Sequence, residues 1–519
     1  MKPAFPVVDL FAGPGGLGEG FSAFCDSRGQ HPFAIALSVE KEPSAFETLR
    51  LRSFLRQFGQ KFPKEYYSFI NGATSSPDWG HLYPKEWEAA CHEALRLELG
   101  TSTAKAVLRP RLTELRKTAS TRSVLIGGPP CQAYSLVGRA RNRGIKGYKA
   151  RNDLRHFLYR EYIEVIHQLQ PAVFVMENVK GMISSSVDGK EIFDLVLSDL
   201  RDAGGRKNSY RLFALSSTAE GRMTLAVPSH HRSFVVRAEE FGVPQARHRV
   251  IVIGVRADIE VQDAIDLTAD DHTSKSPPDP QIVRSVLSGM PRLRSGLSKN
   301  DSHDRWVSEV SSSLSRIVKL SDSNHDLTDI ADRAKKIQAR FRDTASKLHR
   351  VASEPPSIGS TAAPRLRRWL LDSKIEAAPN SETRTHMPAD LTRYLFSAIF
   401  GAVRGRSPKA SDFPASLSPS HRNWKTGKFS DRFRVQLDDR PSSTITSHIA
   451  KDGHYFIHPD PLQCRSLTVR EAARLQTFPD NYYFTGNRTQ QYVQVGNAVP
   501  PYLALQIAEV VANVVKKAT

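Results

Sequence analysis

Short apolar runs alternate with amphipathic stretches through the first half of the chain. We expect strands at five of these runs: Pro6–Phe11, Ala34–Val39, Ser123–Ile126, Ala172–Met176 and Arg249–Val255. The stretches between them carry apolar residues at helical spacing, as in Phe157–Leu169. Strands that alternate with helices predict an α/β fold, in which a parallel sheet is covered by helices on both faces.

One stretch fits this alternation poorly. Residues from about Arg50 to Thr121 form a segment longer than a single crossover needs. We interpret it as a helical insertion, at about 75–120, next to a strand near Tyr66–Ile70.

The character of the chain changes after about Asp258. Residues 270–280 are polar and proline-rich, which is typical of a linker, and residues 283–440 are rich in Arg, Lys, Ser and Pro. Helices are expected at Asp326–His349, at Thr468–Gln476 and from about Tyr502 to Lys517. A chain of 519 residues is too long for one ordinary core, so we expect more than one domain.

Charge and cysteine content narrow the class of protein. The net charge of +19 and the pI of about 9.8 favour a polyanionic partner, although a basic soluble surface is the alternative. The four cysteines are far apart and form no CxxC pair, which argues against a disulfide framework and a structural zinc site. The N-terminus lacks a signal-peptide layout, and no apolar run approaches the ~20 residues of a membrane span. We therefore expect a cytoplasmic protein without a metal.

The first motif is a glycine-rich turn that follows the first expected strand, Asp-Leu-Phe-Ala-Gly-Pro-Gly-Gly-Leu-Gly at 9–18. Glycines allow a ligand to approach the backbone, and the helix that follows offers free N–H groups to an anion. Glu40, at the end of the second strand, is placed to accept hydrogen bonds from ribose hydroxyls. This pattern fits a nucleotide-like ligand but does not separate NAD from S-adenosylmethionine, and a plain tight turn with a solvated Glu40 is the simpler alternative.

The second motif is Gly-Gly-Pro-Pro-Cys-Gln-Ala-Tyr-Ser at 127–135, directly after the third strand. Two prolines stiffen the turn and fix the direction of the Cys131 thiol at the carboxyl end of the sheet. Six cations follow with no carboxylate between Gln132 and Asn152, and cationic surroundings favour the reactive thiolate. With three interspersed glycines, the segment is either a loop that closes on a phosphate backbone or a basic surface loop.

Two further motifs accompany Cys131. Glu177, in Glu-Asn-Val, ends the next strand and should open at the same edge of the sheet, where a buried carboxyl can serve as a proton donor. In Gln-Ala-Arg-His-Arg at 245–249, alternation places Arg247 and Arg249 on one face, where they suit a phosphate or a carbonyl oxygen beside a carboxylate. His248 falls on the other face and is expected to be structural.

Taken in order, these motifs resemble the DNA (cytosine-5) methyltransferase family. The matching blocks lie at 9–21, 129–132, 177–179, 245–249, 465–476 and 494–500. They cover residues 5–255 and about 440–519. One block alone could arise by chance, but six in the family's order form a specific signal.

The resemblance implies a Rossmann-like S-adenosylmethionine-dependent sheet in a catalytic domain at 1–258. A smaller target-recognition domain would occupy 259–440, and a C-terminal segment at 441–519 would return to complete the catalytic domain. The implied reaction transfers a methyl group to C5 of a flipped cytosine in double-stranded DNA through a covalent adduct with Cys131. The chain is expected to be a monomer, in a restriction or phage-defence setting that could supply partner proteins.

The resemblance also assigns residues. Cys131 is the nucleophile, Glu177 the group at cytosine N3, and Arg247 or Arg249 the contact to cytosine O2. The cofactor is held by Phe11, Gly13, Gly15, Gly16, Glu40, Pro129 and Asn497. The residues implied to contact DNA are Gln132, Ser135, Arg139, Arg141 and Arg143. Arg470, Glu471 and Arg474 are implied to organise the DNA cleft.

The chain departs from the family pattern at the adenine end of the cofactor site. The family usually places an acidic residue just after the third strand, whereas Asn71 and Gly72 follow the strand expected near Tyr66–Ile70. Lys41 follows Glu40 where an aromatic residue often packs on the adenine.

Three other functions use some of the same residues. An NAD-linked oxidoreductase would use the glycine turn and Glu40 but leaves the Pro-Pro-Cys turn unexplained. An enzyme acting on tRNA would use the same blocks, but the long basic 260–440 region suits duplex DNA better. A DNA-binding regulator with a degenerate site would have no need of Cys131, Glu177 and Arg249.

Overall fold

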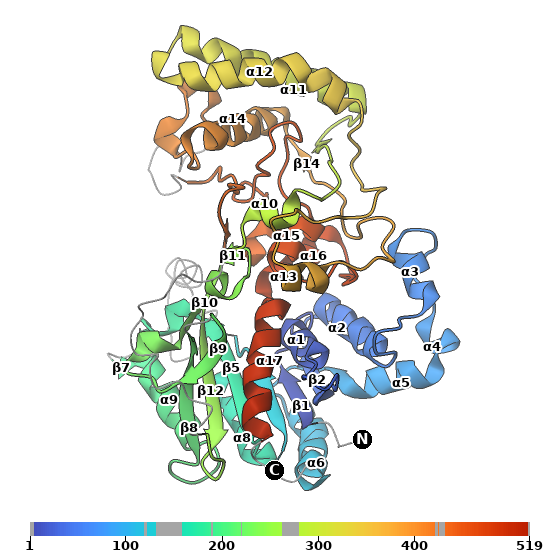
Figure 1. Cartoon of the computed structure of the whole chain (residues 1–519), viewed down its shortest axis with the longest axis vertical. Helices are drawn as coiled ribbons and strands as arrows, with labels where there is room; N and C mark the ends of the chain where they lie inside the picture. The colour runs from blue at the N-terminus through green and yellow to red at the C-terminus, as the bar shows by residue number, and fades with distance from the viewer. Residues whose placement is uncertain are drawn as a thin grey trace. The chain divides into compact units, whose positions relative to one another are not determined.

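The chain forms two compact units in a computed structural model, which describes residues 5–118, 122–130, 158–187, 190–218, 221–261, 280–420, 424 and 431–516. The first unit comprises residues 1–63, 78–280 and 498–519, and the second comprises 64–77 and 281–497. Figure 1 shows their elements in colours that follow the chain.

A mixed sheet forms the centre of the first unit. Its strands are β1 (Phe5–Leu10), β2 (Phe33–Glu40), β3 (Ala94–Arg96), β4 (Val124–Gly127), β5 (Val173–Val179), β8 (Tyr210–Ser217), β9 (Met223–Ala226), β10 (Val235–Arg237) and β12 (His248–Arg256). They lie in the order β3-β2-β1-β4-β5-β12-β8-β9, with β10 beside β12. The first five strands are parallel, whereas β12 runs antiparallel to β5 and β8. The expected sheet is confirmed in its parallel half, while its other half is antiparallel.

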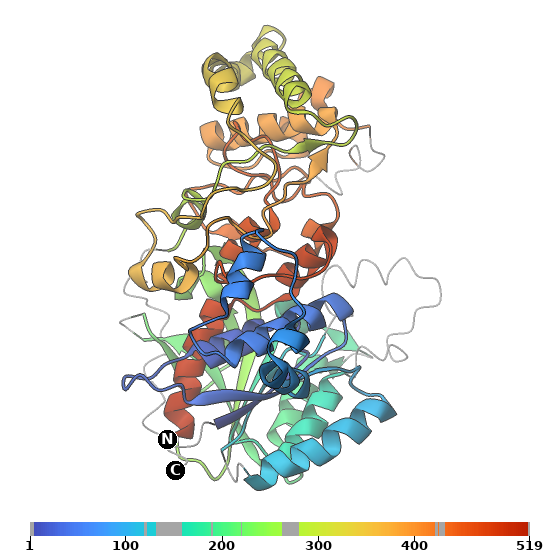
Figure 2. The same cartoon turned by 90° about the vertical axis from the view of Figure 1, so that its right-hand side faces the viewer.

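Helices cover both faces of this sheet. On one face lie α1 (Gly16–Ala23), α2 (Pro43–Arg56) and α17 (Pro501–Val515), with α1 and α17 side by side (Figure 1). On the other face, α6 (Ser102–Thr118), α8 (Leu158–Leu169) and α9 (Ile192–Arg201) pack on one apolar cluster with the strands. Figure 2 shows α6, in light blue, in the lower part of this unit. Short helices α4 (Trp79–Leu82) and α5 (Pro84–Glu93) precede β3.

The prediction of a strand near Tyr66–Ile70 is wrong. Residues Lys64–Ile70 form the helix α3, which belongs to the second unit. Its aromatic residues favour a strand by propensity, but Tyr66 and Ile70 are four residues apart and are the two buried side chains of α3. The Tyr66 hydroxyl donates to the carbonyl oxygen of Asn481 at 2.6 Å, so tertiary contacts decide the conformation.

The second unit is mainly helical. Its longer helices are α11 (His303–Val318), α12 (Thr328–Ala345) and α14 (Pro388–Arg404), which share an apolar core. The others are α10 (Val283–Leu287), α13 (Pro364–Leu370), α15 (Val469–Leu475) and α16 (Arg488–Asn497). Two short strands, β13 (Gly296–Leu297) and β14 (Thr385–His386), pair in parallel.

Residues 441–497 lie in this second unit, so the chain returns to the first unit at Ala498 and not at about 440. The reason is a set of buried arginines that bind carbonyl oxygens of the second unit: Arg465 binds Leu293, Arg470 binds Pro379, and Arg474 binds Val286, at 3.1, 3.0 and 2.8 Å. Arg465 and Arg474 also make bidentate ion pairs with Glu471 and Asp480. These residues organise the interior of the second unit. The expected domain roles stay predictions.

The apolar helical stretch Arg488–Val515 has the length and composition of a membrane span. However, 83% of its most apolar window is buried inside the protein, as in a core helix.

Two buried histidines should make stability depend on pH. Burial lowers the pKa of His386 from 6.5 to about 3 and that of His458 to about 4. The unfolded chain then takes up protons near pH 6.5 that the folded chain does not. We therefore expect the free energy of unfolding to fall with decreasing pH by about 1.4 kcal/mol per pH unit for each histidine.

Denaturant unfolding between about pH 6.5 and 5 measures this slope, since the loss from Glu471, whose pKa is lowered from 4.5 to about 2, is largely confined to lower pH. Burial raises the pKa of Asp9 to about 8, which opposes the slope by the same amount in the wild type and in each histidine variant. His386→Gln and His458→Gln should each make the slope shallower, whatever they do to stability at neutral pH. An unchanged slope in both variants would reject this explanation.

Candidate active site

Three parallel strands bring the predicted motifs to one edge of the sheet. The direction in which successive strands are added to the sheet reverses between β1 and β4. In open α/β sheets, ligands bind at the carboxyl ends of the strands where this reversal occurs. The glycine turn follows β1, the Pro-Pro-Cys turn follows β4, and Glu177 lies near the end of β5. In the register, Leu10 pairs with Gly127, and Gly127 pairs with Met176.

The glycine turn is fixed by the carboxylate of Glu40. The Gly13 N–H donates to Glu40 Oε2 at 2.8 Å, and the N–H groups of Lys41 and Glu42 donate to Oε1 at 2.9 and 2.7 Å. Gly13 and Gly15 have φ of 57° and 101°, which glycine tolerates. Phe11 also has a positive φ, 55°, a conformation that costs a non-glycine residue about 1–3 kcal/mol.

The first helix after this turn packs closely on the C-terminal segment. A Cβ at Gly16 would lie 2.3 Å from the carbonyl oxygen of Val499, and one at Gly20 would lie 2.4 Å from the Leu505 nitrogen. Only glycine therefore allows this approach. This contact places Val499 beside the glycine turn.

The turn that leads to Cys131 is tied to the Glu-Asn-Val motif. The Asn178 side chain donates from Nδ2 to the carbonyl oxygen of Pro129 at 3.0 Å, and both residues are buried. A Cβ at Gly128 would lie 2.8 Å from Glu177 Oε2, so this carboxylate directly adjoins the turn. The chain is described up to Pro130, the residue before Cys131.

Glu177 forms an ion pair with Arg249. Arg249 Nε lies 2.8 Å from Glu177 Oε1, and these side chains are 14% and 13% exposed. β12 places them together, since Ile251 pairs with Glu177 in the sheet. Burial lowers the pKa of Arg249, and the Glu177 carboxylate opposes that shift. The second carboxylate oxygen, Oε2, faces the Pro-Pro-Cys turn.

The two arginines of the fourth motif have different partners. Arg247 is 1% exposed and donates from Nη2 to the carbonyl oxygen of Ala498 at 2.8 Å. Burial lowers its pKa well below the ordinary value. Arg247 thus ties the motif to the C-terminal segment, whereas Arg249 reaches the carboxylate. His248 lies 2.7 Å from Glu239, in keeping with the structural role expected for it.

Glu98 is an acidic residue that follows the third strand of the parallel half and that the sequence analysis does not single out. The third strand of the parallel half is β3, two residues before Glu98, and not the segment near Tyr66–Ile70. Glu98 Oε1 lies 3.2 Å from Lys41 Nζ, so it adjoins the residue that follows Glu40. The signal in the sequence was the three-residue run Ala94–Arg96, which is too short to be recognised by periodicity.

Several predicted residues are not tested by this geometry. Cys131 and the expected DNA contacts lie outside the described residues; the latter are Gln132, Ser135, Arg139, Arg141 and Arg143. Asn497 is the last residue of α16 and of the second unit.

A comparison with protein families identifies the chain. The model of the C-5 cytosine-specific DNA methylase family matches residues 111–513. The chain belongs to this family. It is an S-adenosylmethionine-dependent DNA (cytosine-5) methyltransferase, which rules out the oxidoreductase alternative.

Relatives of this methyltransferase match it along its whole length. The type II methyltransferase M.Bpa9945I of Bacillus paralicheniformis is 32% identical over 525 residues, covering 98% of this chain and 99% of the relative. The type II methyltransferase M.AgeI of Thalassovita gelatinovora is 25% identical and covers 97% and 98%. The crystal structure of a candidate DNA modification methyltransferase encoded within an E. coli prophage has a TM-score of 0.51 at 18% identity, and covers 99% and 100%. That likeness supports the fold.

The described residues of this methyltransferase fit its cofactor. The N-terminus of α1 has Gly15 as its cap without a capping side chain, so its N–H groups suit the cofactor carboxylate. Glu40 accepts three backbone N–H groups, yet its two oxygens have capacity for ribose hydroxyls.

Proposed function

We propose that this methyltransferase acts through a covalent adduct between the Cys131 thiolate and C6 of cytosine, with Glu177 at N3. The observation that carries the proposal is the position of Glu177, held by Arg249 on one side and adjoining Gly128 of the Pro-Pro-Cys turn on the other. A carboxylate fixed in this way is preorganised for one edge of a base.

The proposed reaction proceeds by addition to C6, methyl transfer to C5 and elimination. Addition of the thiolate to C6, with a proton delivered to N3 by Glu177 once its carboxyl is protonated, converts the ring into an enamine that is nucleophilic at C5. S-adenosylmethionine supplies the methyl group that C5 takes. Solvent water then takes the C5 proton, the N3 proton returns to Glu177, and Cys131 leaves as the thiolate, which restores the ring. Arg249 keeps Glu177 in place and contacts O2, while Arg247 positions the motif through Ala498.

The proposed cofactor contacts surround the glycine turn. Backbone N–H groups of the turn bind the carboxylate, Glu40 binds the ribose, and Phe11 packs on the cofactor, with Gly13, Gly15, Gly16, Pro129 and Asn497 completing the site. Glu98 is the acidic residue that we assign to the adenine, in place of the segment after α3.

The DNA contacts are proposed from the sequence. C5 is out of reach within a duplex, so the cytosine must be flipped out of the helix. We assign the basic loop after Cys131 to the phosphates, and the 259–440 region to recognition of the target sequence. The names of the relatives support a restriction–modification setting, in which this chain would act in the cytoplasm as a monomer.

Bisulfite sequencing of duplex DNA after reaction with S-adenosylmethionine tests this function. We expect protected cytosines at one short sequence, and no protection when the cofactor is omitted. Methyl transfer to adenine, or to RNA and not to DNA, would contradict the proposal.

A further inference from the structure

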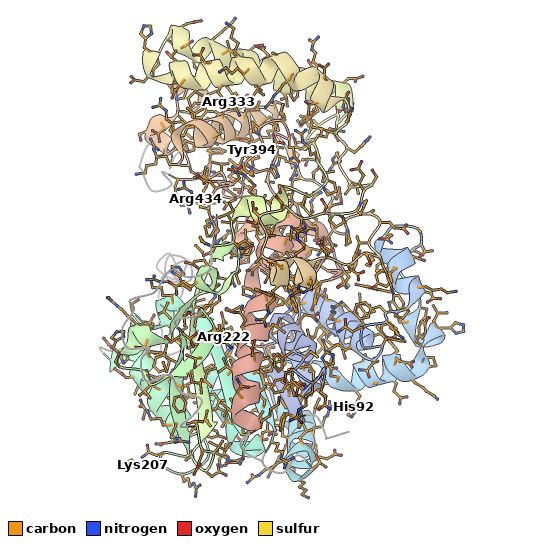
Figure 3. The ribbon with its side chains drawn as sticks, in the orientation of Figure 1. His92, Lys207, Arg222, Arg333, Tyr394 and Arg434 are labelled. Atoms are coloured by element: carbon orange, nitrogen blue, oxygen red, sulfur yellow. The ribbon has the colours of Figure 1, made fainter. Side chains whose placement is uncertain are left out.

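Within the described part of the second unit, exposed cations without an ionic partner are most numerous on α12. Most arginines of the second unit pair with carboxylates, as Arg284, Arg292, Arg393 and Arg406 do with Asp438, Asp460, Asp390 and Asp412. Five basic residues of α12 are exposed and take part in no ion pair within the described part of the chain: Arg333, Lys335, Lys336, Arg340 and Arg342. Figure 3 labels Arg333 on this helix.

Helical periodicity divides these cations between two sides of α12. At 100° per residue, Arg333, Lys336 and Arg340 fall within about 60° of one another and form one side, which we call the α12 stripe. Lys335 and Arg342 fall on the opposite flank. The exposed Asp332 and Asp343 lie on the ridge between the two, and Asp329 is already paired with Arg404 at 2.8 Å.

The spacing of the stripe suits a nucleic-acid strand. Residues 333 to 340 span about 10.5 Å along the helix axis. One strand of duplex DNA presents a phosphate about every 3.4 Å of its axis, so the stripe can face about three phosphates. An anionic membrane fits less well, because the apolar side of α12 is buried in the core of the second unit, through Ile330, Ala334, Ile337, Phe341 and Ala345.

We propose that the α12 stripe binds the phosphate backbone of the DNA substrate. The proposal rests on the proposed function only in taking duplex DNA as the substrate. Cations with no acidic partner among the described residues have no internal ion pair to break when they meet phosphates, so their binding releases counterions without that cost. The stripe therefore adds affinity that does not depend on base sequence.

A matched pair of double variants tests the stripe. Arg333→Gln/Arg340→Gln removes two cations seven residues apart from the stripe, and Lys335→Gln/Arg342→Gln removes two at the same spacing from the opposite flank. DNA affinity is measured by fluorescence anisotropy between about 50 and 200 mM salt. For the stripe variant we expect the slope of log K against log salt to become shallower by about 1.8, and affinity at physiological salt to fall about tenfold. The flank variant should change by less than half as much.

Equal losses in the two variants would overturn the proposal, because they would reflect net charge alone. Unchanged affinity in the stripe variant would overturn it as well. The rate of methyl transfer at saturating DNA separates an effect on DNA affinity from an effect on catalysis. At saturating DNA, the stripe variant should retain wild-type turnover. A wild-type protein that binds DNA through the stripe but transfers no methyl group would refute the proposed function and leave this inference intact.

Discussion

Replacement of Cys131 by alanine is expected to abolish methyl transfer while DNA binding persists. The thiolate forms the bond that makes C5 reactive, so without it the ring has no route to the nucleophilic enamine. Loss of a covalent nucleophile typically costs at least about 10⁴-fold in turnover. Transfer of labelled methyl groups to DNA measures the rate, and a gel-shift assay at low salt measures binding.

Three other cysteines provide the control for this prediction. Cys25 is exposed, Cys91 is half-buried and Cys464 is buried. Burial raises the pKa of Cys464 strongly, so its thiol is not suited to attack. Cys25→Ala and Cys91→Ala should keep wild-type turnover. An active Cys131→Ala variant would show that the nucleophile is assigned to the wrong residue.

Replacement of Glu177 by glutamine is expected to lower the single-turnover rate by at least about 10²-fold, the low end for acid–base catalysis. Glutamine keeps the shape of the side chain but does not supply a proton to N3, and it removes the ion pair with Arg249 at 2.8 Å. Rapid-quench measurement with enzyme in excess over DNA isolates this step from product release.

Glu239→Gln is the matched control, because Glu239 also pairs with a basic side chain of the same motif, His248, at 2.7 Å. We expect that variant to keep the chemical rate. If Glu177→Gln and Glu239→Gln slowed the reaction equally, or neither slowed it, the role of Glu177 would be refuted.

The sequence predicted the part of the fold that carries the chemistry. Strands β1, β4 and β5 are almost wholly buried, so they appear as continuous apolar runs followed by the conspicuous motifs. The ion pair between Glu177 and Arg249 follows from two motifs whose strands are neighbours. These features are local, or lie between adjacent strands, and a pattern can reveal them.

Other features depend on contacts between distant parts of the chain. Arg247 and Arg249 are equivalent in the motif, and the carbonyl that distinguishes them belongs to Ala498, 251 residues away. The helix α3 was mistaken for a strand because its partner, Asn481, lies 415 residues from Tyr66. Because the sequence pattern places the third strand near Tyr66–Ile70 and not at Ala94–Arg96, it does not identify Glu98 as the acidic residue that follows that strand.

The central claim is that Cys131 bonds to the base beside Glu177. Duplex DNA in which the target cytosine is replaced by 5-fluorocytosine blocks the loss of the C5 substituent, so the adduct accumulates once S-adenosylmethionine is added. Mass spectrometry of the digested complex should locate DNA on the peptide that contains residue 131, and nowhere in the Cys131→Ala variant. An adduct on the peptide of another cysteine, or no adduct from a protein that methylates ordinary DNA, would contradict the account.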